Sequence, residues 1–200
     1  MKKNICLSVL ASSILCTNIA NASEINLPKP KINTPLTKLI DARKTTREIS
    51  NKPIELEVLS NILWAAFGTN SHNTRTIPTG KNEQDLKVFV VYDNKIWLYD
   101  GKNNKLNQYS QADIMPYLAK QDFVNDAPVH IIYAGGKHYA FAHSGSAYQN
   151  VYLYAAEKGL ATVIRGYFDA DKVHQALNLS DNEIVTYHQV VGYPKTDKDM

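Results

Sequence analysis

Apolar residues recur at helical spacing in three stretches of the chain. The first, residues 34–40, opens with Thr-Pro, a pair that suits a helix start, and continues in an apolar stripe. The second spans about 55–67 and the third, the longest, about 144–158. Gly68 and Gly159 follow these two stretches and can end their helices. We expect the first two helices to face the core.

Short runs rich in β-branched and aromatic residues lie between these helices. Residues 87–93 and 95–100 read KVFVVYD and KIWLYD, and a turn near Asp93-Asn94 predicts that they form a hairpin. Residues 128–134, PVHIIYA, predict a buried strand that ends at two glycines, and residues 184–191 predict a last strand.

The remaining segments complete the predicted element order. Residues 23–33 contain two prolines and indicate an extended arm, and residues 69–86 indicate a loop. Shorter helices are predicted over about 111–120 and 171–177. The order ααββαβααβ favours an α+β fold with an antiparallel-rich sheet covered by helices, in a single domain spanning 34–200.

The first 22 residues have the pattern of a secretory signal peptide. Two lysines precede an apolar stretch that ends in Ala20-Asn21-Ala22, which predicts cleavage after Ala22 and a periplasmic or secreted protein. A retained membrane anchor is the alternative. However, the stretch is about 15 residues long and contains polar residues, whereas a spanning helix needs about 20 apolar ones.

Cleavage at this site would change the composition. Both cysteines, Cys6 and Cys16, lie in the leader, so the remaining 178 residues could hold neither a disulfide nor a thiolate site. Twenty basic and 19 acidic residues would remain, a balance that does not favour binding to nucleic acid or stable attachment to a membrane. We also expect no metal site, because His138 and His143 have no carboxylate at a known ligand spacing.

A basic segment follows the first predicted helix. Arg43, Lys44 and Arg47 flank the hydroxyls of Thr45 and Thr46. Guanidinium groups and hydroxyls together suit a phosphate, which accepts hydrogen bonds from several directions. A solvated basic turn would have the same composition.

Two other segments could contact a ligand. Pro78, Gly80, Asn82 and Gln84 offer a shaped loop with amides that can pair with the edge of a flavin or a base, although ordinary loop polarity explains them equally well. Residues 144–146, Ser-Gly-Ser, could expose backbone N–H groups at a helix N-terminus and stabilise negative charge, or could simply cap that helix.

Three tyrosines lie on and around the longest predicted helix. Tyr148, Tyr152 and Tyr154 are expected to pack in the core or in an interface. Stacking of one of these rings on a ligand is the alternative.

Taken in order, these stretches resemble the FMN-dependent nitroreductase superfamily, and most closely its thiazoline/oxazoline-oxidase-type dehydrogenases. The resemblance covers about residues 36–195. It is carried by the segments RKTTREIS, LSNILWAAFGTN, RTIPTGKNEQDLKVFVVYDNKIWLYD, QDFVNDAPVHIIYA, GSAYQNVYLYAAEKGLATVIRGYFD and VVGYP.

The resemblance implies an FMN site and assigns residues to it. The basic segment would bind the phosphate and ribityl chain through Arg43, Lys44, Thr45 and Arg47. The flavin ring would lie along Pro78, Thr79, Asn82 and Gln84, with the backbone of Ser144 and Gly145 near its N5 and O4 edge. Many relatives have further basic residues near the C-terminus, where this chain offers Lys195.

The resemblance also implies an interlocked homodimer with two FMN sites at its interface. Hydride transfer through flavin N5 would follow a ping-pong scheme with a small organic substrate, such as a nitroaromatic or a quinone. Export would separate the enzyme from cytoplasmic NAD(P)H, so its electron donor is unknown. The alternative function is a cofactor-free member of the fold that acts as an exported binding or interaction module.

Overall fold

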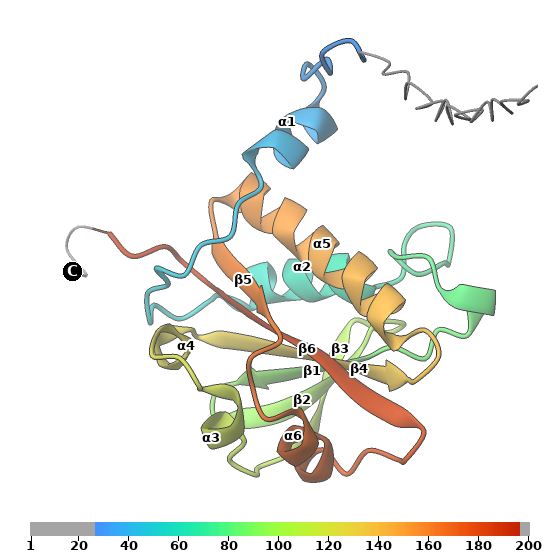
Figure 1. Cartoon of the computed structure of the whole chain (residues 1–200), viewed down its shortest axis with the longest axis vertical. Helices are drawn as coiled ribbons and strands as arrows, with labels where there is room; N and C mark the ends of the chain where they lie inside the picture. Colours follow the sequence, from blue (N-terminus) through green and yellow to red (C-terminus); the bar gives the residue numbers. More distant parts are fainter. Residues whose placement is uncertain (1–26, 197–200) are drawn as a thin grey trace, which may run out of the picture. The chain divides into compact units, whose positions relative to one another are not determined.

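The computed structural model describes residues 27–196, and the predicted signal peptide, its predicted cleavage site and residues 23–26 of the predicted arm lie outside this range. Residues 27–31 are exposed and carry no helix or strand, and residues from Ile32 onward form a separate compact unit. Its elements (Figure 1) are α1 (Pro35–Ala42), α2 (Leu56–Phe67), the 3-10 turn η1 (Gly80–Asn82), β1 (Lys87–Tyr92), β2 (Lys95–Asp100), β3 (Lys105–Ser110), α3 (Met115–Leu118), α4 (Phe123–Asp126), β4 (Val129–Gly136), α5 (Ala140–Lys158), β5 (Ala161–Arg165), α6 (Ala170–Ala176) and β6 (Glu183–Gly192).

The sheet has six strands in the order β3-β2-β1-β4-β6-β5, and every neighbouring pair is antiparallel. The predicted α+β class with an antiparallel sheet is therefore confirmed. The β1–β2 hairpin turns at Asp93 and Asn94, both with φ above +50°, as a two-residue type I′ turn requires. β5 forms one edge of the sheet, so the outer side of its backbone is free to pair with other parts of the chain.

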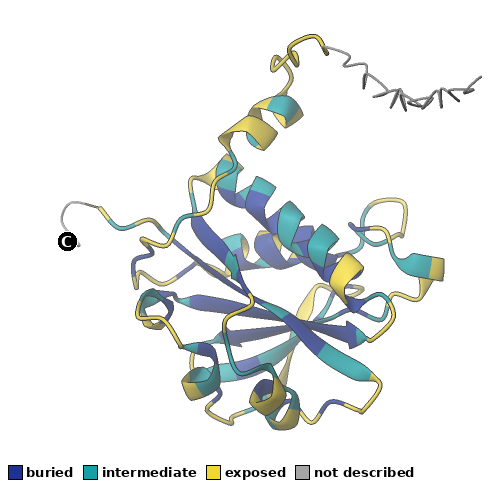
Figure 2. Ribbon diagram, viewed as in Figure 1, coloured by how far each residue is buried: buried dark blue, intermediate teal, exposed yellow. Residues whose placement is uncertain are grey.

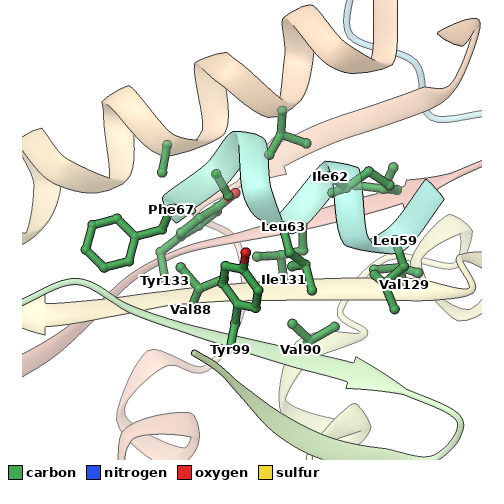
Figure 3. Packing of buried hydrophobic residues seen from close by; sticks show 14 of the residues in the cluster. Leu59, Ile62, Leu63, Phe67, Val88, Val90, Tyr99, Val129, Ile131 and Tyr133 are labelled. Atoms are coloured by element: carbon green, nitrogen blue, oxygen red, sulfur yellow. The ribbon is translucent and has the colours of Figure 1, made fainter. Parts of the chain in front are cut away.

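Helices cover both faces of the sheet because successive strand residues point to opposite sides. Val88 and Val90 of β1 contact the layer of α2 and α5, whereas Phe89 and Val91 contact the layer of α3 and α6. Figure 3 shows the first layer, in which the α2 side chains Leu59, Ile62, Leu63 and Phe67 lie over Val88, Val90, Val129, Ile131 and Tyr133 of the strands.

The predicted helix α1 forms, but the expectation that it faces the core is wrong. Thr34 and Thr37 cap it reciprocally, with Thr34 Oγ1 accepting the N–H of Thr37 at 3.3 Å. No residue of α1 is buried, and Leu36 and Ile40 are 58% and 54% exposed. Figure 2 shows α1 as mostly exposed, in contrast to α5 and the central strands. Its apolar stripe therefore has no sufficient cover within one chain.

Three other predictions need correction. The helix expected over 111–120 is reduced to the single turn α3, because Pro116 has no N–H and its ring would clash with the preceding turn of a longer helix. The chain has two strands, β3 and β5, that the pattern did not predict. The longest helix, α5, begins at Ala140 and not at Ser144, although it ends at Gly159 as predicted, with that glycine in the left-handed region at φ 64°.

Candidate functional site

The basic segment 43–47 runs along the free edge of β5. The N–H of Thr46 donates to the carbonyl of Thr162 at 3.0 Å. Two residues further along the strand, the N–H of Ile164 donates to the hydroxyl of Tyr152 at 3.0 Å, and this hydroxyl lies 3.1 Å from Thr45 Oγ1. Tyr152 of α5 therefore joins the edge strand to the basic segment.

The cations of this segment have no acidic partner. Arg43 is half-buried, with its guanidinium carbon 5.2 Å from the centre of the Tyr152 ring, and Lys44 and Arg47 are exposed. Within residues 27–196 none of the three forms an ion pair with a carboxylate. Beside them, a pocket of about 170 Å³ lies between the end of α1, the C-terminal half of α5 and the start of β5, and Lys44 and Thr46 line it. Three unpaired cations beside hydroxyl groups form a donor set that suits a phosphate.

The structure brings Lys195 near this segment but gives its charge another partner. The N–H of Lys195 donates to the carbonyl of Glu48 at 3.0 Å, and Ile49 bridges to Pro194. The ammonium of Lys195 lies 2.8 Å from Asp126 Oδ2. Asp126 therefore neutralises the positive charge that Lys195 would otherwise offer to a phosphate.

The second group of residues expected at the site lies on the loop before β1. Pro78, Asn82 and Gln84 are exposed, and Thr79 is half-buried. The amide of Gln84 donates to Asn82 Oδ1 at 2.8 Å and accepts the Nε–H of Arg75 at 3.1 Å. The structure thus joins the two expected amides to each other.

The backbone of this loop is unusual. Lys81, Asn82 and Gln84 all have φ between 50° and 57°, in the left-handed region that residues other than glycine rarely adopt. Such conformations cost free energy and persist where surrounding contacts hold them.

A buried histidine holds this loop. The N–H of Gly80 donates to His143 Nε2 at 2.7 Å, and His143 Nδ1 lies 2.9 Å from Asp85 Oδ1. The other oxygen of Asp85 accepts the N–H of Gly136 at 3.0 Å. His143 is only 2% exposed. We refer to Gly80, Asp85, Gly136 and His143 as the loop clamp.

The expectation that Ser144 and Gly145 expose backbone N–H groups at a helix N-terminus is wrong. Because α5 begins at Ala140, Ser144 and Gly145 lie inside the helix and not at its N-terminus. Ser144 is fully buried, and its hydroxyl lies 2.7 Å from that of Thr186. Gly145 is half-buried, and a Cβ placed there would meet no atom within 4 Å. It therefore marks an open spot on the helix surface.

Within one chain, the basic segment and the loop before β1 lie at different positions along α5. The basic segment lies beside Tyr152, and the loop lies beside His143. These two residues are nine apart, which is about 13 Å along a helix axis. Arg43, Thr45 and Arg47 thus share one region, whereas Asn82 and Gln84 share another.

A polar cluster lies on the sheet face that α3, α4 and α6 cover. Arg165 donates through Nη1 to the carbonyl of Leu118 at 3.0 Å and to His188 Nδ1 at 2.9 Å, and His188 Nε2 lies 3.2 Å from His130 Nδ1. Burial lowers the pKa of His130 to about 4 and lowers the pKa of His188 well below its usual value. The nearby guanidinium of Arg165 lowers both further. The two imidazoles are therefore neutral.

Sequence reasoning missed two residues that organise the candidate site. Tyr152 was expected only to pack or to stack, and its helical spacing gives no sign of the hydroxyl contacts. His143 was considered only as a metal ligand, whereas its partners Gly80 and Asp85 lie about 60 residues earlier in the chain. Among residues 27–196, no three metal-ligating side chains cluster. No helix in that range has the length and apolar character needed to cross a membrane.

Comparison with known proteins gives one family. The family model described as "Nitroreductase family" matches residues 40–193. A protein named as a nitroreductase, MJ1384 of Methanocaldococcus jannaschii, is 26% identical over an alignment of 186 positions that covers 82% of this chain and 93% of the relative.

Solved structures show the same fold. A protein of Ralstonia eutropha described as a nitroreductase is 28% identical, with a TM-score of 0.75 and coverage of 85% of this chain and 89% of that chain. A chain of the Escherichia coli microcin synthetase McbBCD complex aligns with a TM-score of 0.63 at 15% identity, covering 98% of this chain and 79% of its own. At that identity the likeness concerns the fold alone.

Proposed function

The chain belongs to the nitroreductase family of oxidoreductases, and we propose that it binds FMN and transfers electrons between an extracytoplasmic donor and a small organic acceptor. The observation that carries the proposal is the basic segment on the edge of β5. It presents Arg43, Lys44 and Arg47 without acidic partners within residues 27–196, and Tyr152 holds the neighbouring Thr45.

The side chains present fit the phosphate end of FMN. The phosphate oxygens would accept hydrogen bonds from the guanidinium groups of Arg43 and Arg47 and from the hydroxyl of Thr45. Hydrogen bonds to a charged phosphate are stronger than those between neutral groups. Lys195 would contribute only if it left Asp126, so we assign it a minor role. The half-buried position of Arg43 on the Tyr152 ring orients its charge before any ligand arrives.

The amides of Asn82 and Gln84 fit the other end of the cofactor. A flavin ring presents alternating donors and acceptors along one edge, and a carboxamide can pair with both kinds of group. Pro78 and Thr79 lie on the same loop and would lie along the ring. Gly145 offers an open surface on α5 where a flat ring could approach closely.

When bound, FMN supplies hydride transfer at its N5 atom, taking two electrons from a donor and passing them to an acceptor in a ping-pong reaction. The protein's residues hold the cofactor, leave one face open to the substrate and offset negative charge. We propose that the acceptor is a quinone, a nitroaromatic or a similar small molecule.

We propose that the active form is a homodimer. The exposed apolar residues Leu36 and Ile40 of α1 need cover that one chain does not give, and the basic segment and the loop lie at different levels of α5. A partner chain could bring the loop of one subunit to the basic segment of the other. Each flavin site would then be completed by two chains.

The proposed location outside the cytoplasm rests on the leader-like residues 1–22. There the donor would be a membrane redox partner or an oxidisable substrate, since NAD(P)H is a cytoplasmic pool. Membership of the thiazoline/oxazoline-oxidase branch stays a proposal that rests on the sequence motifs. The alternative is an exported protein of the same fold that binds a partner without any cofactor.

Acceptor turnover tests the reaction. The protein loaded with FMN is reduced with dithionite, freed of excess reductant and mixed with a quinone or a nitroaromatic without oxygen. We expect a reoxidation rate that saturates with acceptor concentration, which free reduced FMN at equal concentration would not show. A rate that rises linearly and equals that of free FMN would contradict enzymatic transfer.

A further inference from the structure

The loop clamp fixes the tautomer of His143. The backbone N–H of Gly80 can only donate, so His143 Nε2, at 2.7 Å from it, must be the acceptor and carry no proton. The proton therefore lies on Nδ1, which faces Asp85 Oδ1 at 2.9 Å. The imidazole is neutral, and its contact with the carboxylate is a hydrogen bond from a neutral donor.

The clamp joins two regions that are distant in sequence, residues 80–85 before β1 and residues 136–143 from the end of β4 to the start of α5. Asp85 accepts from His143 through one oxygen and from the N–H of Gly136, at the end of β4, through the other. The carbonyl of Gly80 accepts the N–H of Glu83 at 3.0 Å, so both the backbone N–H and the backbone carbonyl of Gly80 are hydrogen-bonded. The start of α5, the end of β4 and the segment before β1 thereby share one rigid junction with the loop.

Close packing around the clamp leaves room only for glycine at two positions. A Cβ on Gly80 would lie 2.8 Å from ring atoms of Tyr139, and one on Gly136 would lie 2.5 Å from Asp85 Oδ2. The Tyr139 ring stacks on that of His143 with centroids 5.6 Å apart. The imidazole therefore has little space to turn away from Gly80.

The clamp lies next to the strained part of the loop. Lys81, Asn82 and Gln84, the residues with positive φ, follow Gly80 directly or closely. The side-chain hydrogen bonds of Asn82 and Gln84 are exposed, and the N–H of Asn82 donates to the carbonyl of Thr79 at 3.1 Å within the loop. The bonds of Gly80 and Asp85 to His143, in contrast, reach a buried ring. The buried bonds are the stronger constraint on the loop conformation.

We propose that His143 is a positioning residue that sets the conformation of residues 78–84 through its bond to Gly80. The consequence for cofactor binding rests on the proposed function, because Asn82 and Gln84 are the residues expected along the flavin ring. The side-chain hydrogen bonds of His143 go to Gly80 and Asp85 and to neither of these side chains. Its effect on the flavin would pass through the backbone of the loop.

Two substitutions separate the two bonds of the imidazole. In His143→Gln the side-chain oxygen reaches the position of Nε2 and can still accept from Gly80. In His143→Asn the shorter amide reaches only the position of Nδ1, so it keeps a donor to Asp85 and loses the acceptor for Gly80. His174→Asn is the matched control, because the Nε2 atom of His174 contacts the carbonyls of Ser180 and Glu183 on another part of the molecule.

Hydrogen exchange of the Gly80 amide and FMN titration provide two independent measurements. We expect the Gly80 amide to be protected in the wild type, His143→Gln and His174→Asn, and to lose protection in His143→Asn. FMN affinity should fall about five- to tenfold in His143→Asn and less than about twofold in the other two variants.

The outcomes distinguish failure of the clamp from failure of the cofactor proposal. Unchanged Gly80 protection in folded His143→Asn, or equal loss of FMN affinity in the Asn and Gln variants, would overturn the role of His143. If no form binds FMN, the proposed function fails, and Gly80 exchange still decides whether the clamp holds the loop. If His143→Asn does not fold, nitrogen NMR of the wild-type imidazole decides: a proton on Nδ1 supports the clamp, and a proton on Nε2 overturns it.

Discussion

Tyr152 and Thr45, which are 107 residues apart in the chain, hold their hydroxyl oxygens 3.1 Å from each other. The Tyr152 hydroxyl also accepts the N–H of Ile164 on the edge strand β5. One phenol group thus fixes the basic segment to the sheet at the place where the phosphate of FMN is proposed to bind.

Removal of this hydroxyl should weaken cofactor binding. Tyr152→Phe keeps the ring under Arg43 and leaves Ile164 N–H and Thr45 without this partner. We expect a loss of about 1–2 kcal/mol in unfolding free energy and a several-fold weaker FMN affinity, because each net hydrogen bond contributes about 1 kcal/mol. Urea denaturation and FMN fluorescence titration measure these effects.

Tyr148→Phe is the control for that substitution. Tyr148 lies one turn earlier on α5, with its ring 6.4 Å from that of Tyr152, and its hydroxyl makes no hydrogen bond within residues 27–196. We expect little change in either quantity. Equal effects of the two substitutions would show that the Tyr152 hydroxyl has no special role.

The cations of the basic segment should determine FMN affinity. Arg43→Ala combined with Arg47→Ala removes both guanidinium groups and should reduce affinity at least a hundredfold, since hydrogen bonds to charged groups contribute about 1.5–3 kcal/mol each. Equilibrium titration of the purified variant measures the loss. Lys102→Ala combined with Lys105→Ala removes two exposed cations near β3 and should leave the affinity unchanged. Equal losses in the two double variants would point to net charge and not to a specific site.

Stability should decrease in acid because of the buried histidines. The pKa of His130 is about 4 in the folded protein and near 6.5 in the unfolded chain, so only the unfolded chain takes up this proton between those values. Unfolding free energy is therefore retained above pH 6.5 and lost as the pH decreases, by roughly 3 kcal/mol near pH 4 from His130. The lowered pKa of His188 adds to the loss.

Urea denaturation at pH 7.5 and 4.5 checks this sign. His130→Asn keeps an acceptor oxygen near the position of Nδ1 and removes the titration, so its unfolding free energy should change less between the two pH values. A wild-type stability that is equal at both pH values, or higher at pH 4.5, would contradict the assignment of neutral buried imidazoles.

Exposed apolar residues of α1 should matter for assembly and not for the fold. Leu36→Ser with Ile40→Ser changes two side chains that are more than half exposed in one chain. We expect the far-ultraviolet circular dichroism to stay the same and sedimentation to shift from dimer to monomer. A wild type that sediments as a monomer at micromolar concentration would contradict the proposed dimer.

The sequence predicted those elements whose pattern is set by burial. β1 and β4 are rich in buried apolar residues, and α2 and the C-terminal part of α5 carry apolar side chains toward the sheet, so their periodicity was visible. β3 was missed because the edge strand KLNQYS is mostly polar and exposed. β5 was missed because it is short and follows α5 after only two residues.

The candidate site was predictable only in part, because its contacts join residues that are far apart in sequence. The residues of the basic segment and of the loop could be named from their chemistry and their resemblance to a family. The contacts that hold them could not, because Thr45 depends on Tyr152, and Gly80 depends on His143, across long intervals of sequence. At the early start of α5, the ring of Tyr139 at the capping position stacks on His143, and the sequence pattern does not reveal this contact.

Titration of purified residues 23–200 with FMN tests the proposed cofactor most directly. We expect a yellow protein that binds about one FMN per chain, quenches or shifts flavin fluorescence on binding, and melts at a higher temperature when FMN is present. A protein that stays colourless after incubation with excess FMN, and whose melting temperature does not change, would contradict the flavoenzyme and favour a cofactor-free binding protein.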